Sequence, residues 1–353
     1  MIRFVIRRLL SSIPVAFGIV ITVFVLARVI PGDPCKGTLG EKATPAQCAS
    51  FIKREGLDRS TLVQFGKYMD KVIHGDLGDS LKFHRSVASL LGERLPTTLE
   101  LAVLALVFAL LVGIPLGVIA AYRRNTAIDA AAVVTANVGV SMPVFWLGLL
   151  LQYFFSITLK GTPLALPPSG RLSAGLIAEP FYKQWGLGKN FLFEFISHFN
   201  ILNGVLQWNW RIVVDAATHL VLPALALGTI PLALIARMTR SSLLDVLGQD
   251  YIRTARAKGL RELLVVRRHA LRSALLPVVT VIGLSLGSLI GGAILTETVF
   301  GLTGVGKTLF DAIESRDYTV VQGFSLIVGL AFVVVNLITD IIYTRIDPRV
   351  RVS

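Results

Sequence analysis

Residues Gly301 to Thr308 form the stretch of this chain with the most specific chemical pattern. They read GLTGVGKT, which matches G-x-x-x-x-G-K-S/T at every fixed position. In a phosphate-binding loop, that spacing lets backbone N–H groups surround a phosphate while the lysine reaches it and the hydroxyl holds magnesium. The chemistry also requires a β-strand before the loop and a magnesium-binding aspartate on a later strand.

The surroundings of this pattern argue against a nucleotide site. A glycine-rich apolar run precedes it, and only 45 residues follow it, many of them in the last apolar run. No room remains for a nucleotide-binding α/β domain. We therefore predict that Gly301, Gly304 and Gly306 form a tight turn and that Lys307 is a solvated charge.

No other catalytic pattern is present in the sequence. The five histidines are scattered, and neither H-E-x-x-H nor G-x-S-x-G occurs. Thr296 and Glu297 form an isolated polar pair at the end of an apolar run. Capping of a helix end is the favoured role for this pair, and Glu297 is also a candidate for contact with a transported substrate. We expect no catalytic residue and no bound metal or cofactor in this chain.

The two cysteines, Cys35 and Cys48, both lie in one polar segment between the first two apolar runs. A pair 13 positions apart on an oxidising face could form a disulfide, worth about 3 kcal/mol by chain entropy. Two free thiols are the alternative. A zinc site is disfavoured because no histidine or further cysteine lies nearby at ligand spacing.

A strongly basic segment runs from Gln249 to Pro277, between two apolar runs. It contains seven arginines and lysines against only Asp250 and Glu262. Positive charge in short loops collects on the cytoplasmic side of a membrane. Apolar residues at helical spacing predict two short helices that meet at Gly259, outside the bilayer. A solvated loop that only sets topology is the alternative.

The composition places these residues in a membrane protein. Hydrophobic residues make up 54% of the chain, charged residues 16%, and the mean hydropathy is +0.69. The net charge is +13. The basic residues lie beside apolar runs rather than on one face of a soluble domain, which disfavours nucleic-acid binding. The fold class we predict is all-α, a polytopic membrane protein with six transmembrane helices. The expected spans are residues 9–30, 99–122, 130–159, 216–238, 276–295 and 321–343.

Arginines beside the spans predict the orientation of the chain. Those before the first span, in the loop after the second and beyond the sixth place both termini in the cytoplasm. They are Arg3, Arg7, Arg8, Arg123, Arg124, Arg345, Arg349 and Arg351. The first run is too long for a signal peptide and lacks a small-residue cleavage site, so we expect an uncleaved helix that ends at Pro31 and Pro34.

Polar and small residues interrupt several of the predicted spans. Asn137, Ser141 and Pro143 break the third span, where polar groups line a translocation path or pack against another helix. The second span contains Gly113 and Gly117. The fifth contains four glycines that predict close helix packing, namely Gly283, Gly287, Gly291 and Gly292. Outside the membrane we expect residues 35–97 and 160–215. The second of these segments is rich in aromatic residues, typical of an interfacial belt or a docking surface.

Several phrases in the chain resemble one family of transporters. RTARAKGL from Arg253, followed by HALRSALLP, looks like the cytoplasmic coupling loop of ABC importer permeases, in the dipeptide, oligopeptide and nickel branch. IPGDP at 30–34, HGDLGDS at 74–80 and NLITDIIYTRIDPRVR near the C-terminus are similar to the same branch. Of the general motif, Ala255, Gly259 and Leu271 are kept, while Arg253, Thr254, His269 and Arg272 depart from it.

The resemblance implies a type I ABC importer permease fold with a first segment at 1–98, a five-span core at 99–353 and a coupling loop at 238–275. It implies a homologous second permease, two ATPase subunits that bind ATP and magnesium, an extracytoplasmic peptide-binding protein, and the bacterial inner membrane. The residues it implies for ATPase contact are Asp250, Tyr251, Arg253, Thr254, Ala255, Lys258 and Gly259. The substrate would be a dipeptide or oligopeptide, with nickel, an oligosaccharide or another solute as the alternative. Alternatives from other classes of protein are a membrane NTPase that uses residues 301–308, or a passive channel or receptor.

Overall fold

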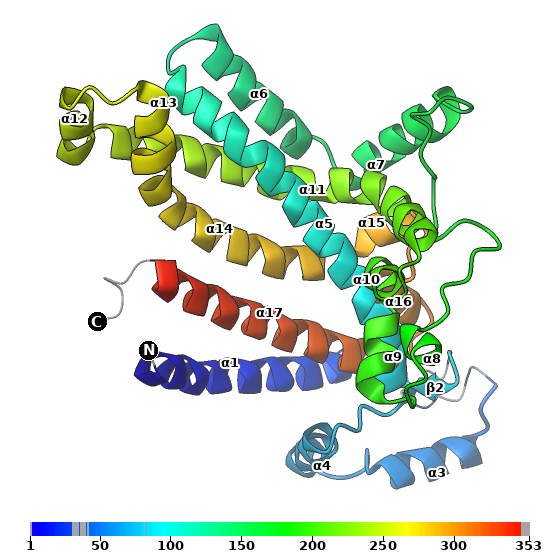
Figure 1. Ribbon diagram of the computed structural model, residues 1–353. Helices are drawn as coiled ribbons and strands as arrows, with labels where there is room; N and C mark the ends of the chain where they lie inside the picture. Colours follow the sequence, from blue (N-terminus) through cyan, green and yellow to red (C-terminus); the bar gives the residue numbers. More distant parts are fainter. Residues whose placement is uncertain (1, 30–34, 36–39, 41, 81, 347–353) are drawn as a thin grey trace.

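The computed structural model describes residues 2–29, 35, 40, 42–80 and 82–346. Within these residues the regular structure is helical except for one antiparallel pair of two-residue strands, β1 (Asp79–Ser80) and β2 (Arg85–Ser86). The chain is therefore an all-α protein, as its composition predicted. Five long helices dominate it (Figure 1): α1 (Ile2–Val29), α5 (Val87–Tyr122), α11 (Trp210–Leu247), α14 (Leu271–Gly292) and α17 (Tyr318–Ile346).

All five long helices are apolar and long enough to cross a bilayer. The third predicted span is not one helix. It consists of α6 (Ala127–Ser141) and α7 (Val144–Gln152), extended by a π-helical turn (Tyr153–Thr158), and the two parts are bent by 98°. The cause is Pro143, which disfavours a helical conformation at the preceding residue; Met142 is extended, with φ −106° and ψ 139°. Six spans result when the bent pair is counted as one.

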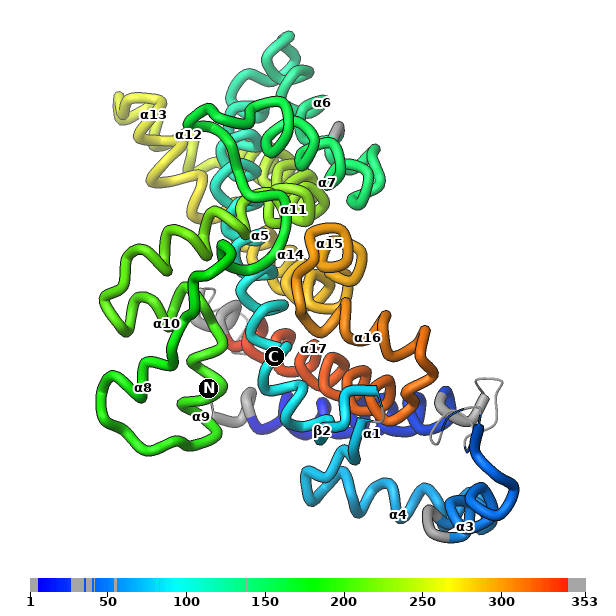
Figure 2. Tube along the Cα trace, turned by 90° about the vertical axis from the view of Figure 1, so that its right-hand side faces the viewer, coloured from blue at the N-terminus to red at the C-terminus, as the bar shows by residue number. Residues whose placement is uncertain are grey.

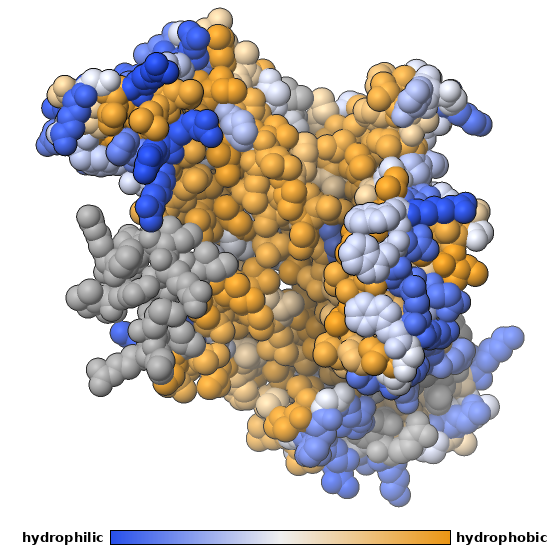
Figure 3. Space-filling model, in the orientation of Figure 1, coloured by the Kyte–Doolittle hydropathy of each residue, from blue (hydrophilic) through white to orange (hydrophobic). Residues whose placement is uncertain are grey.

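An apolar band covers the face of the molecule seen in Figure 3, and polar residues gather at its two ends. Large apolar side chains such as Leu111 and Val134 are 70% and 60% exposed. A surface of this kind is stable against lipid rather than water, because lipid imposes no cost on exposed hydrocarbon. The chain is a multi-pass membrane protein.

Helices α5 and α11 pack along each other at the centre of the molecule, and glycines let their backbones approach. A Cβ added to Gly117 would lie 2.5 Å from the Ala236 carbonyl oxygen, and one on Gly228 would lie 2.6 Å from that of Ala105. On α14 the prediction of glycine-mediated packing holds for two positions, Gly283 against Thr339 and Gly287 against Phe332. At Gly291 and Gly292, where the helix ends, no atom of the described part of the chain lies within 4 Å of the added Cβ, so the packing prediction stays untested there.

The second span begins earlier than its hydropathy indicated. Ser86 caps α5 by accepting the Ser89 N–H, and Val87, Leu90 and Leu91 are buried against α17 and α16 (Val305–Glu314). The apolar run at residue 99 marks where the helix becomes continuously hydrophobic, not where it starts. Residues 87–98 of the predicted first segment therefore form the first turns of α5.

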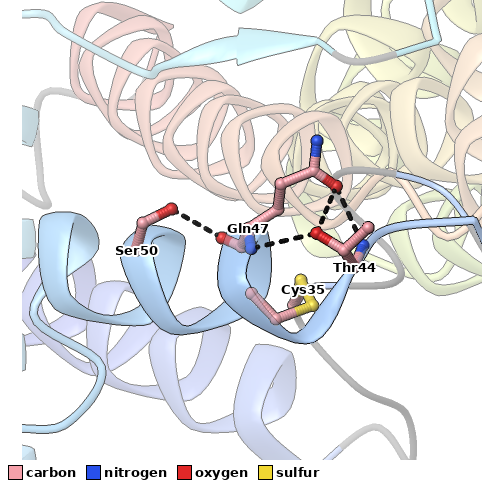
Figure 4. Close-up of a disulfide and its surroundings, with 5 residues drawn as sticks. Cys35, Thr44, Gln47 and Ser50 are labelled. Carbon is pink, nitrogen blue, oxygen red and sulfur yellow. Dashed lines mark hydrogen bonds between the residues drawn. A yellow bond between two sulfur atoms is a disulfide. The ribbon is translucent and has the colours of Figure 1, made fainter.

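Two shorter helices follow the first span, α3 (Pro45–Glu55) and α4 (Thr61–Ile73). A capping box between Thr44 and Gln47 starts α3, and Cys48 in its first turn is bonded to Cys35 (Figure 4). The disulfide thus ties the chain leaving the first span to the start of α3. Pro31 and Pro34, predicted to end that span, lie outside the described residues, as do Arg349 and Arg351.

The remaining helices cluster at two opposite ends of the long helices. One end carries α12 (Asp250–Ala257) and α13 (Glu262–Leu264), the latter extended by a π-helical turn (Val265–Ala270); α1 starts and α17 stops at this end (Figure 1). The other end, in front in Figure 2, carries α16 and four short helices. These four are α8 (Phe181–Gln184), α9 (Phe191–Ser197), α10 (Asn200–Leu206) and α15 (Ile294–Val299).

Candidate functional site

Helix α12 contains most of the residues predicted to contact an ATPase. Asp250 in its first turn and Arg256 in its last complement the helix dipole. Ile252 and Ala255 are 0% and 7% exposed, and they anchor α12 on a small apolar cluster of its own. The other members of this cluster are Ala121, Leu243, Val265, Val266, Ala270 and Ala274. The cluster fixes α12 relative to both α11 and α14.

The opposite face of α12 is exposed. The side chains of Asp250 and Arg253 are 96% and 73% exposed and form an ion pair of 3.5 Å, and Tyr251 is 46% exposed. Thr254 and Lys258 are exposed as well. Ala255 is therefore the predicted contact residue whose side chain is buried, beneath the face that the other contact residues present. The exposed set combines an aromatic ring with charges, a composition found at protein interfaces.

A turn and an ion pair connect α12 to the next helix. Gly259 has φ +73°, a left-handed conformation that glycine adopts without strain. Across this turn, Arg256 donates two hydrogen bonds to Glu262, of 3.0 and 2.7 Å. The second helix is not the separate short helix expected from the sequence. It continues through the π-helical turn into α14, so α12 is joined to a span by one turn.

A second ion pair at this end was not predicted from the sequence. Arg240 on α11 donates to both carboxylate oxygens of Asp129 on α6, each at 2.7 Å, and Asp129 also accepts the Asn125 N–H at 3.0 Å. Bidentate geometry of this kind is the strong form of an arginine–carboxylate contact. It ties the α5–α6 loop to α11 close to α12. The only signal in the sequence was that Asp129 and Arg240 carry opposite charges. Both lie near ends of spans that are predicted to be on the same side of the membrane.

The predicted path residues lie in two separate places. Asn137 and Ser141 are one turn apart on α6, just before the bend, and the Ser141 hydroxyl donates to the Asn137 carbonyl at 3.0 Å. Glu297 lies on α15, which packs against α7 beyond the bend, and is 0% exposed. In the described residues, the Glu297 carboxylate is bonded to Thr98 and Lys307 rather than to either α6 residue.

Glu297 is bound by the same segment that imitates a phosphate-binding loop. Its carboxylate accepts the Lys307 N–H at 2.8 Å and the Thr98 hydroxyl at 2.6 Å, and that hydroxyl accepts the Val305 N–H. A Cβ on Gly304 would collide with this carboxylate. Burial raises the pKa of Glu297 to about 7, against the lowering effect of these hydrogen bonds.

The N–H groups that would hold a phosphate are thus occupied by an internal carboxylate at the start of α16. A helix, α15, precedes the turn where a nucleotide site requires a strand. Lys307 is not a fully solvated charge, as the sequence suggested, because it pairs with Asp311 at 3.2 Å one turn along α16. Of the three glycines predicted to form a tight turn, Gly301 does so, with φ +61°, whereas Gly304 is the N-cap of α16 and Gly306 lies in its first turn.

Buried polar contacts attach the loop after α7 to the bundle. Arg171 donates to the carboxylate of Glu100 on α5 at 3.4 Å and to the His198 carbonyl at 2.6 Å. Burial lowers the pKa of Arg171, while the Glu100 carboxylate acts in the opposite direction. Glu100 also accepts the Ile201 N–H at 2.8 Å. These contacts fix the ends of α9 and α10 to α5.

Comparison with known proteins defines the class to which this architecture belongs. Residues 113–352 match the model of the family described as binding-protein-dependent transport system inner membrane component, and residues 1–102 match the model of its N-terminal part. The chain belongs to this family of membrane transport components.

Individual relatives align over nearly the whole chain. The dipeptide transport system permease protein DppB of Escherichia coli K12 is 44% identical over 99% of both chains. The protein of the same name from Alkalihalophilus pseudofirmus is 42% identical over 99% of this chain and all of its own. The di/tripeptide transport system permease protein DppB of Pseudomonas aeruginosa is 43% identical over 99% of both chains.

Proposed function

We propose that this chain is a permease subunit of an ATP-driven ABC importer for dipeptides or oligopeptides. Full-length relatives that are 42–44% identical carry dipeptide or di/tripeptide permease names. The observation that carries the proposal is the exposed face of α12, held on its own apolar cluster at one end of the spans. A transmembrane subunit driven by separate ATPases needs such a rigid, exposed contact.

The proposed complex contains four further chains, of three kinds. A homologous second permease completes the translocation path, two ATPase subunits bind ATP and magnesium, and an extracytoplasmic peptide-binding protein delivers the peptide. We place the chain in the bacterial inner membrane with α12 and both termini in the cytoplasm. The exposed arginines and lysines at the α12 end support this orientation.

In the proposed mechanism, ATP binding closes the two ATPases and displaces α12. The apolar cluster and the Arg256–Glu262 ion pair transmit this motion to α11 and α14. The spans then change from inward-open to outward-open access. This change is driven by the difference between the affinities of the ATPases for the two states of the spans. Asn137, Ser141 and Glu297 remain our candidates for residues that meet the peptide along the path.

The test is a charge reversal on the exposed face of α12. Arg253→Glu should abolish peptide-stimulated ATP hydrolysis in the reconstituted complex and weaken recovery of the ATPase chains with a C-terminally tagged permease. Arg267→Glu is the matched control, because Arg267 is also exposed at this end but lies off α12. Normal stimulation in Arg253→Glu would contradict the proposal. Stimulation by nickel or an oligosaccharide, and not by peptides, would keep the importer and reassign its substrate.

A further inference from the structure

Helix α4 presents an apolar side that the described part of the chain leaves uncovered. Leu62 and Ile73 are 84% and 73% exposed, and no residue of the helix is buried. Met69 lies between them on the same side, because these three residues fall within about 40° of one another at 100° per residue. Such a stripe marks an interaction surface.

The side of α4 opposite this stripe is polar and is turned toward the connection from α3. Gln64, Lys67 and Lys71 lie roughly 170° from the apolar stripe by the same helical geometry. The Gln64 amide donates to the carbonyl oxygens of Leu57 and Arg59, at 3.1 and 2.8 Å, which fixes this direction. The apolar stripe therefore points away from α3.

A third side of α4 packs against α1, within the apolar segment of that helix. The ring of Phe65 lies 5.1 Å from that of Phe24 and 6.0 Å from that of Phe17, and Tyr68 lies 5.7 Å from Phe24. Phe17 precedes Leu26, the last residue of the apolar segment of α1, by nine residues, or roughly 13 Å of helix. Contact with Phe17 thus brings α4 alongside hydrocarbon rather than above it.

The surroundings of α4 are continuous with the lipid-facing surface. Both views place α3 and α4 at the edge of the molecule beside α1, with α3 farther than α4 from the α12 end in Figure 1. Exposed apolar residues of α1 next to the aromatic contact include Ile21, Val25 and Leu26. A helix with one polar side and one apolar side, lying against a span, has the composition of an interfacial membrane helix.

We propose that α4 is embedded in the leaflet remote from α12, with Leu62, Met69 and Ile73 resting on lipid acyl chains. The polar side carries α3 and the Cys35–Cys48 disulfide above the membrane surface. The segment between the first two spans is then held by lipid as well as by α1.

The test uses spin labels on single introduced cysteines in the full complex. Leu62→Cys, Ile73→Cys and the control Lys67→Cys are labelled without reductant, so the native cysteine pair stays bonded. The complex is reconstituted in vesicles of phosphatidylethanolamine and phosphatidylglycerol. Collision rates with oxygen, which concentrates in hydrocarbon, and with a water-soluble nickel chelate are then compared.

We expect the oxygen-to-nickel collision ratio to be several-fold higher at positions 62 and 73 than at position 67. Equal, nickel-dominated rates at all three positions would overturn the proposal, because the stripe would then face water. Protection of 62 and 73 from both reagents would also overturn it, and would assign the stripe to a protein partner. Two stripe positions are labelled so that a local disturbance at one of them does not decide the result.

Discussion

At the scale of single residues, Glu297 is the group around which the phosphate-loop pattern of this chain is folded. Gly304 and the N–H groups of Gly306 and Lys307 are arranged around a carboxylate of the same molecule. The sequence supplied an argument against a nucleotide, since a glycine-rich apolar run precedes the pattern where a nucleotide site requires a strand. It did not predict the carboxylate, because Thr98 and Glu297 are 199 residues apart and only the folded chain joins them.

The buried carboxyl of Glu297 predicts a pH dependence of stability. Its pKa of about 7 in the folded protein is above the ordinary value of 4.5. The contribution to stability is therefore full below pH 4.5 and is lost as pH rises toward 7, by about 3 kcal/mol. Glu297→Gln removes the titrating group. We expect its thermal unfolding temperature to fall less than that of the wild type between pH 5 and pH 8.

Thermal unfolding of both proteins in detergent, at matched ionic strength, measures this difference. The comparison cancels the other titrating groups, because both proteins share them. Parallel curves for the two proteins across this pH range would show that Glu297 is ionised at all these values, and the prediction would fail.

At the scale of elements, hydropathy located the spans but not their ends or breaks. The third span was predicted to be interrupted at Pro143, but its sharp bend was not, since a proline indicates a break without giving its angle. The start of α5 was missed because residues 87–98 are stabilised by contacts with α16 and α17. Such contacts between distant segments leave no local pattern in the sequence. Helix α12 itself was predicted because its apolar spacing and the break at Gly259 are local signals.

The link between α12 and α14 supports a prediction on coupling. Arg256 and Glu262 are 40% and 38% exposed, so their ion pair adds at most about 1 kcal/mol to stability. Glu262→Ala should therefore leave the unfolding temperature nearly unchanged and reduce peptide-stimulated ATP hydrolysis, since α12 is then held less firmly. The double variant Arg256→Glu, Glu262→Arg restores the pair.

Stimulated ATP hydrolysis in the reconstituted complex is the measurement for both variants. Recovery of stimulation in the double variant identifies the ion pair as the cause. Wild-type stimulation in Glu262→Ala would mean that the apolar cluster alone positions α12.

At the scale of the whole molecule, the packing of α5 against α11 forms the centre of the helix bundle. A methyl group on Gly228 would lie 2.6 Å from a backbone oxygen of α5, so Gly228→Ala forces the two helices apart and costs about 1–3 kcal/mol. Gly291→Ala on α14 is the matched control, because nothing lies within 4 Å of that position. We expect a lowered unfolding temperature and yield for Gly228→Ala only. Equal behaviour of the two variants in detergent would contradict the tight approach of α5 and α11.

The length of α11 has a mechanical consequence. Its 38 residues extend over roughly 57 Å, nearly twice the thickness of bilayer hydrocarbon. The helix packs along α5 between Gly228 and Thr239, and its C-terminal end adjoins the apolar cluster under α12. A tilt of about 10° over this length displaces one tip by roughly 10 Å relative to the other. In the proposed mechanism, a small displacement at the α12 end therefore becomes a larger one at the opposite face of the membrane.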